Sequence, residues 1–191
     1  MDHLSGTGEA QELEAMRLLA EGNDAALNAL MEDWSPRVTA MLYRMTGNPA
    51  VASDLAQETF VRLYQTCRRF RPGNATRPFS TWLFGIAANL AKNHLRWKRR
   101  HPEASLESVA DPLAADNPAS SAESAERSAA VSKAVSTLPI DQREVLILSE
   151  YEGLSHAEIA SVVGCSVKAV ERRISHARET LRRDLTRYLR E

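Results

Sequence analysis

Residues 155–181 read SHAEIASVVGCSVKAVERRISHARETL, and this stretch decides the fold of the second half of the chain. Ser155 and Glu158 have the spacing of a capping box, in which each side chain bonds the backbone N–H of the other residue at a helix start. Gly164 can take the left-handed conformation that ends a helix, and Ser166 can cap the next one. The stretch therefore predicts a short helix, a tight turn and a longer second helix, which is the helix-turn-helix pattern.

The second helix of this motif has one apolar and one polar side. Apolar residues such as Val170, Ile174 and Leu181 recur at helical spacing and predict the buried side. Arginine can donate two hydrogen bonds to guanine, whereas other arginines suit phosphate contacts. The candidate DNA-contacting residues are Lys168, Glu171, Arg172, Arg173, Ser175, His176 and Arg178. The alternative is a plain helical hairpin with a solvated charged side.

Residues 25–100 predict a separate module of three helices. A first helix follows Asp24, a plausible N-cap, and ends at Gly47-Asn48-Pro49. A second covers about 51–69, and a loop from Arg71 to Pro78 precedes a third at about 79–100. The apolar residues expected in the core recur at three- and four-residue steps. They are Leu55, Phe60, Leu63, Tyr64 and Cys67 in the second helix and Phe79, Leu83, Ile86, Leu90 and Trp97 in the third.

Charge is distributed unevenly along the chain. Residues 77–100 hold six Lys and Arg and no acid, whereas residues 101–126 hold six acids, three prolines and no Lys or Arg. The second composition buries too little apolar surface to offset the entropy of ordering, so it predicts a flexible linker. Residues 166–191 are basic again, with eight bases against four acids. Two basic segments joined by a tether suggest an extended anionic partner.

The predicted fold is all-α, with two small helical domains joined by a flexible linker. The expected division is an N-terminal extension (1–24), a first domain (25–100), an acidic linker (101–126) and a second domain (127–191). The extension is either disordered or forms one extra helix at about 9–21.

Composition excludes several classes of function. No run of eighteen apolar residues predicts a membrane-spanning helix, and the acidic N-terminus is not a targeting signal, so we expect a cytoplasmic protein. Two distant cysteines, Cys67 and Cys165, make neither a disulfide framework nor a CxxC site. The five histidines are scattered, with no HExxH, and no phosphate-binding GxxxxGK[ST] loop is present. We therefore expect no metal, no cofactor and no catalytic activity.

Two blocks of sequence resemble a known family. Residues 54–65, DLAQETFVRLYQ, and 70–100, FRPGNATRPFSTWLFGIAANLAKNHLRWKRR, are similar to region 2 of the extracytoplasmic-function sigma factors. Residues 138–182, which begin LPIDQREVLILSEYEGLSHAEIA, resemble their region 4. The order and spacing of the blocks also fit. The resemblance implies a bacterial factor that binds core RNA polymerase, recognises promoter DNA and promotes strand opening.

The resemblance also implies roles for particular residues. The 54–65 helix would bind the clamp helices of the largest polymerase subunit, through Asp54, Gln57, Glu58, Arg62 and Gln65. The loop before the third helix and that helix would hold the −10 element, through Asn74, Thr76, Asn89, Lys92, Asn93, Arg96 and Arg99. The helix-turn-helix would read the −35 element. Further implied partners are the flap of the second-largest subunit and an anti-sigma factor.

Two departures from the family pattern limit this transfer. Glu171 stands where many relatives carry a base, and the −10 loop contains Pro72 and Pro78, so neither promoter sequence is carried over. A stand-alone helix-turn-helix regulator that binds a palindromic site as a dimer is the alternative function. An enzyme acting on nucleic acid is a third, which lacks any constellation that meets the geometric requirements for catalysis.

Overall fold

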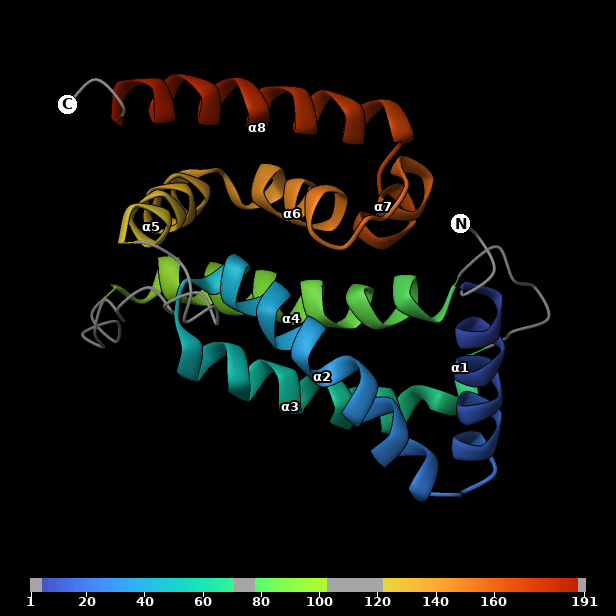
Figure 1. The fold of residues 1–191 in the computed structure, drawn as a ribbon. Coiled ribbons are helices and arrows are strands. Elements are labelled where there is room, and N and C mark those ends of the chain that lie inside the picture. Colours follow the sequence, from blue (N-terminus) through green and yellow to red (C-terminus); the bar gives the residue numbers. More distant parts are fainter. Residues whose placement is uncertain (1–4, 71–77, 103–121, 189–191) are drawn as a thin grey trace.

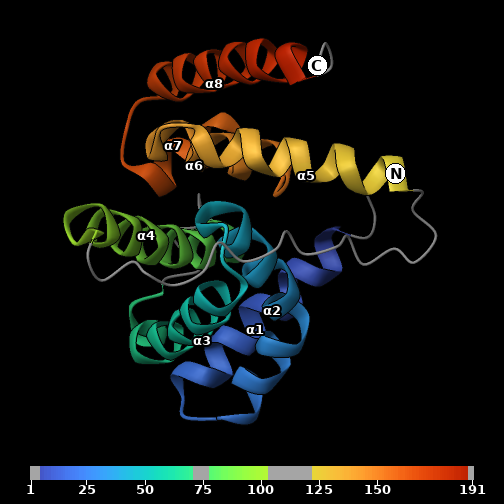
Figure 2. The ribbon, with the colours of Figure 1, turned by 90° about the vertical axis from the view of Figure 1, so that its left-hand side faces the viewer.

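The chain is arranged as two stacked modules of helices. The structure, a computed structural model, describes residues 5–70, 78–102 and 122–188. The N-terminal module contains α1 (Ser5–Ala20), α2 (Ala25–Thr46), α3 (Pro49–Thr66), the short 3-10 helix η1 (Cys67–Arg69) and α4 (Phe79–Arg100). The C-terminal module contains α5 (Ala122–Thr137), α6 (Ile140–Glu150), α7 (His156–Val163) and α8 (Val167–Tyr188). Figures 1 and 2 show the modules stacked, with α8 on the side away from α1–α4. The expected all-α fold of two helical modules is confirmed.

The ends of α2 and α3 follow from local chemistry. Gly47 has φ 70°, and its N–H donates to the carbonyl of Tyr43, which closes α2. The Asn48 side chain then accepts from the N–H of Val51, and Pro49 occupies the first turn of α3. The start of α2 differs from the expectation. The Asp24 side chain makes no capping hydrogen bond.

The Asn23 side chain takes the place predicted for Asp24, because its Oδ1 accepts from the N–H of Ala25 at 3.1 Å. Pro36 lies within α2 and does not end it. Proline lacks the N–H that would donate to the preceding turn of the helix. Helix α2 nevertheless continues past Pro36, because buried side chains hold it in the core on both sides of this position.

An aromatic cluster forms the centre of the N-terminal module. Trp34 of α2 meets Phe79 and Phe84 of α4 edge-on, with ring centroids 5.6 and 5.7 Å apart. Buried methionine and leucine side chains of α2, α3 and α4 belong to the same core, and so does Cys67, a buried free thiol. Edge-on aromatic pairs add about 0.5–1.5 kcal/mol to the area they bury. Phe79 is therefore a core residue, as the sequence predicted.

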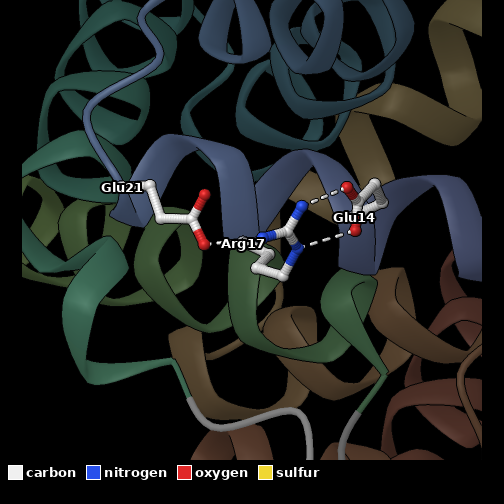
Figure 3. A network of polar contacts seen from close by, with 3 residues as sticks. All are labelled: Glu14, Arg17 and Glu21. Atoms are coloured by element: carbon white, nitrogen blue, oxygen red, sulfur yellow. Dashed lines mark hydrogen bonds and ion pairs between the residues drawn. The ribbon is translucent and has the colours of Figure 1, made fainter.

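The N-terminal extension forms α1, which packs on the rest of its module. Met16 and Leu19 are buried, and Leu19 provides a carbonyl to which the Cys67 thiol donates at 3.9 Å. On its exposed side, Arg17 lies between two glutamates, at 2.6 Å from Glu14 and 2.6 Å from Glu21 (Figure 3). This part of the extension therefore belongs to the folded module, and of the two alternatives left open for it the extra helix is the one observed, with an earlier start.

The C-terminal module begins earlier than expected. Helix α5 starts at Ala122, so residues 122–126 are helical and do not belong to the linker predicted over 101–126. Residues 103–121 of that predicted linker lie outside the described residues. Val145, Ile147, Leu148, Ile159, Val170 and Ile174 form the core of the module. These residues come from α6, α7 and α8, and they hold the three helices as one unit.

Candidate nucleic-acid interface

Helices α7 and α8 form the predicted helix-turn-helix. Ser155 Oγ accepts from the N–H of Glu158, and Glu158 Oε2 accepts from the N–H of Ser155 at 2.8 Å, which completes the capping box. Gly164 takes φ 74° and ends α7. The Ser166 side chain accepts from the N–H of Ala169 at 3.2 Å and starts α8. Local hydrogen bonds thus set both the turn and the direction of α8.

The outer side of α8 carries the predicted base-reading residues. Val170, Ile174 and Ala177 are buried and fix the rotation of the helix. The side chains left exposed on the other side are Lys168, Glu171, Arg172, Ser175 and His176. Most of them border one open hollow on the surface, together with Ser166 and Ala169. The side of α8 that could enter a DNA groove is therefore accessible.

Two predicted phosphate-contacting arginines are held by acids of the same module. Arg178 Nη2 lies 2.5 Å from Glu150 Oε1, and Arg173 Nη2 lies 3.8 Å from Asp141 Oδ2. Arg173 is half-buried, and its Nη1 also lies 3.8 Å from the Cys165 sulfur. These contacts brace α8 against α6. Arg178 stays largely exposed, so it can reach a phosphate, whereas Arg173 is partly committed to the module.

The basic half of α4 presents a second polar surface. Four of the residues predicted to contact the −10 element, Asn89, Asn93, Arg96 and Arg99, are exposed. Asn74 and Thr76, predicted for the same element, lie outside the described residues. Lys92 is the exception, because only 7% of its surface is exposed.

Trp97 departs from the expected core of α4. Its side chain is 46% exposed and stacks on His101, with ring centroids 4.8 Å apart. Helix α4 extends beyond the core at this end, so the core does not cover Trp97, although Trp97 continues the apolar side of the helix. An exposed tryptophan beside Arg96 and Arg100 offers a flat apolar surface next to cationic side chains, which suits contact with bases.

Helix α3 presents a mixed polar and apolar surface. Asp54, Gln57, Arg62 and Gln65 are exposed, and half-buried Glu58 lies 2.7 Å from Arg62. Val61 and Tyr64 are exposed on the same helix, at 48% and 46%. The prediction that Tyr64 lies in the core was wrong. Exposed aromatic and aliphatic side chains among polar ones are typical of protein-binding surfaces.

The two modules share an interface that the sequence analysis did not find. Helix α7 packs on α4, and α5 and α6 pack on α2. Lys92 Nζ of α4 lies 2.9 Å from Glu144 Oε1 of α6, and Thr81 Oγ1 donates to Glu158 Oε1 at 3.3 Å. Arg143 Nη1 donates to the carbonyl of Met45 at 2.6 Å. No local pattern in the sequence signals such contacts between distant segments.

Burial at the interface perturbs its ionisable groups. Glu144 is fully buried, and this raises the pKa of its carboxyl above the ordinary value, an effect that the Lys92 ammonium opposes. Burial likewise raises the pKa of Glu152, which Arg37 opposes from 3.4 Å away. The Arg44 guanidinium stacks over the Tyr151 ring at 4.2 Å. Cations of the N-terminal module therefore meet acids and an aromatic ring of the C-terminal module.

Among the described residues, no helix is long and apolar enough to cross a membrane. In the same part of the chain, no group of three or more His, Cys, Asp or Glu side chains is arranged to hold a metal ion. The polar surfaces of α3, α4 and α8 are the candidate functional surfaces because their side chains are exposed.

Comparisons with known proteins assign the chain to a family. Residues 30–101 match the model of Sigma-70 region 2, and residues 128–181 match that of Sigma-70, region 4. The RNA polymerase sigma-H factor of Pseudomonas aeruginosa is 33% identical over 96% of this chain and 98% of its own length. The ECF RNA polymerase sigma-E factor of Escherichia coli is 33% identical over 84% of this chain and 87% of its own length.

A solved structure gives the same result. The structure of CnrH in complex with the cytosolic domain of CnrY matches with a TM-score of 0.68 and 27% identity, over 92% of this chain and 97% of that one. The match extends over both modules, since neither alone makes up so large a share of the chain. With two family regions in the expected order and relatives that align along nearly their whole length, the chain belongs to the extracytoplasmic-function RNA polymerase sigma factors, which act as alternative sigma factors in transcription initiation.

Proposed function

We propose that this sigma factor binds core RNA polymerase through α3 and reads the two promoter elements with separate helices, the −35 element with α8 and the −10 element with α4 and the loop before it. The observation that carries the proposal is the exposed polar side of α8, which is set by a complete helix-turn-helix and lies on the outer side of the C-terminal module. The division follows the modules: the N-terminal module for the polymerase and the −10 element, and the C-terminal module for the −35 element.

For the −35 element, Arg172 is the main candidate for direct base readout. It is exposed on α8 next to Glu171 and Ser175. A guanidinium can bond the O6 and N7 atoms of guanine together, and a carboxylate can accept from cytosine N4. Arg178 and Lys168 would hold flanking phosphates, which sets the register of the helix and makes binding dependent on salt.

For the −10 element, the exposed amides and cations of α4 support binding of the DNA backbone and of unpaired bases. Asn89, Asn93, Arg96 and Arg99 follow one another along the helix at three- and four-residue steps. Asn74 and Thr76 would hold a base of the non-template strand, and removing a base from the stack costs a few kcal/mol. Recognition of the element and opening of the strands would then be one coupled event.

The polymerase is the partner proposed for α3. Its acidic and polar side chains, with Val61 and Tyr64 exposed among them, suit a protein surface better than phosphates. The clamp helices of the largest subunit would contact this helix, and the flap of the second-largest subunit would contact the C-terminal module. An anti-sigma factor is a further proposed partner, as the family resemblance implies; the similar protein CnrH was itself solved in complex with another protein, the cytosolic domain of CnrY. The sigma factor itself would catalyse no reaction and would work in the cytoplasm, where the polymerase makes the RNA.

The proposal is tested by titrating the chain against promoter duplex with and without core polymerase. We expect weak binding by the chain alone and tight, sequence-selective binding by the chain with polymerase, because the polymerase fixes the spacing of the two modules. A stand-alone regulator would bind the duplex tightly without polymerase and would saturate at two chains per palindromic site.

Reversing the charge of Asp54 is expected to weaken binding to core polymerase. Asp54→Arg should lower the affinity at least about 10-fold, because like charges placed across an interface cost several kcal/mol. Fluorescence anisotropy of the labelled chain, titrated with core polymerase, measures the effect. Glu32→Arg is the matched control, since it makes the same change of charge at an exposed position of α2. Equal affinities for the two variants would remove α3 from the proposed polymerase surface.

A further inference from the structure

Lys92 has a position unlike that of its neighbours on α4. Asn89, Asn93 and Arg96 are exposed, whereas Lys92 is 7% exposed and its ammonium lies 2.9 Å from Oε1 of Glu144. Glu144 belongs to α6 of the other module and is fully buried. Among the described residues, no group donates a hydrogen bond to its carboxylate oxygens, and the Lys92 ammonium is the ion-pair partner that they have. The two charges therefore depend on each other across the interface.

The surrounding contacts keep this pair away from water. Next to Glu144, Arg143 reaches across to the carbonyl of Met45 and also donates to carbonyls of its own module at Ser136 and Leu138. Along the same interface, Arg37 approaches Glu152, and Thr81 donates to Glu158. Acceptors and donors from both modules thus meet at several points on α2, α4, α6 and α7.

We propose that the Lys92–Glu144 ion pair, with Arg143 beside it, is an interdomain clasp that holds the C-terminal module on α4 and withholds Lys92 from DNA until the modules separate. The inference rests on the proposed function only for the role of Lys92 at the −10 element. The clasp itself is a property of the free chain.

The physical basis is competition for one ammonium group. Lys92 cannot be paired with a buried carboxylate and also neutralise a phosphate, because its charge is removed from the surface in the closed arrangement. The exposed side of α8 is free in this arrangement, so the clasp blocks −10 binding more than −35 binding. Binding to polymerase would supply the energy that separates the modules, which couples access to Lys92 with assembly of the holoenzyme.

Lysine acetylation followed by mass spectrometry tests the clasp directly. The chain has four lysines, Lys92, Lys98, Lys133 and Lys168, so the exposed Lys168 serves as an internal reference in each sample. In the free wild-type chain we expect Lys92 to react at least about 10-fold more slowly than Lys168, since only open molecules expose it. In Glu144→Gln, where the closed form leaves the ammonium without its partner, Lys92 should react within about 3-fold of Lys168.

Two further variants keep the test decisive. Glu150→Gln is the matched control, because it removes an ion pair of the same helix that lies within the C-terminal module, and Lys92 should stay protected. Arg37→Glu weakens the interface from the other module by facing Glu152, and it serves if circular dichroism shows that Glu144→Gln is unfolded. Addition of core polymerase to the wild-type chain should also expose Lys92.

Several results would overturn the clasp. One is a wild-type Lys92 as reactive as Lys168, and another is a Lys92 that stays protected in both folded interface variants. Exposure of Lys92 in Glu150→Gln would also contradict it, because the Lys92–Glu144 pair is then not the specific restraint. Failure of the proposed function would look different: the acetylation pattern of the free chain would be as expected, but the chain would not support initiation by core polymerase.

Discussion

Replacing Arg143 with lysine is expected to lower the free energy of unfolding by about 3 kcal/mol, because at least one charge-assisted hydrogen bond is lost and backbone carbonyls are left buried without a donor. The guanidinium donates to the carbonyl of Met45 at 2.6 Å and to those of Leu138, at 3.1 Å, and Ser136. The planar guanidinium of arginine can donate to acceptors of both modules at once, whereas the single ammonium of lysine cannot. For a chain of this size, the midpoint of thermal unfolding should fall by about 6–12 °C.

Thermal unfolding followed by circular dichroism at 222 nm measures this effect. Arg172→Lys is the matched control, since it makes the same change at an exposed position of α8, and its midpoint should stay within about 2 °C of wild type. An Arg143→Lys protein that unfolds at the wild-type temperature would show that the contact between Arg143 and Met45 does not hold the modules together.

Replacing Arg172 with alanine is expected to reduce initiation at promoters that depend on the −35 element by about 5- to 150-fold. This range corresponds to the roughly 1–3 kcal/mol that a bidentate contact to guanine contributes to discrimination. Arg172 is exposed on α8, and among the described residues no acid lies within ion-pair distance of it, so its loss should leave the fold intact. Abortive initiation on the cognate promoter, compared with a promoter mutated in the −35 block, measures the effect.

The pattern of the loss distinguishes base readout from general attraction to DNA. Arg183→Ala is the control, because it removes the same charge from an exposed position nearer the far end of the helix. With Arg172→Ala, the difference between the cognate and mutated promoters should disappear, whereas Arg183→Ala should retain it. Equal loss at both promoters in Arg172→Ala would assign Arg172 to phosphate binding and would remove it from base readout.

The helix ends could be predicted because short-range chemistry sets them. Gly47 and Gly164 take positive φ angles where a chain must leave a helix, and the Ser155–Glu158 box needs only residues three apart. The exposed side of α8 could also be predicted, because the spacing of its apolar residues identifies the opposite, buried side. Asp24 was the exception, because an adjacent Asn23 supplied the cap and two neighbouring residues of similar chemistry cannot be ranked from sequence.

What could not be predicted depends on contacts between distant segments. Lys92 fits the polar side of α4 as well as Asn89 or Asn93 does, and only the position of Glu144 in another module explains its burial. Tyr64 and Trp97 fit apolar patterns, yet the core does not extend far enough to cover them. Helical periodicity identifies a side of a helix but not what covers it, so the exposed polar sides of α3, α4 and α8 could be predicted, whereas the interface between the modules was missed.

The most direct test of the central claim is run-off transcription with purified core polymerase on a library of genomic fragments, with and without this chain. We predict that adding the chain starts transcription at a set of sites that share two sequence blocks at a constant spacing, one near −35 and one near −10. Transcripts no more numerous than those made by core polymerase alone would contradict the claim that this chain recognises and opens promoters.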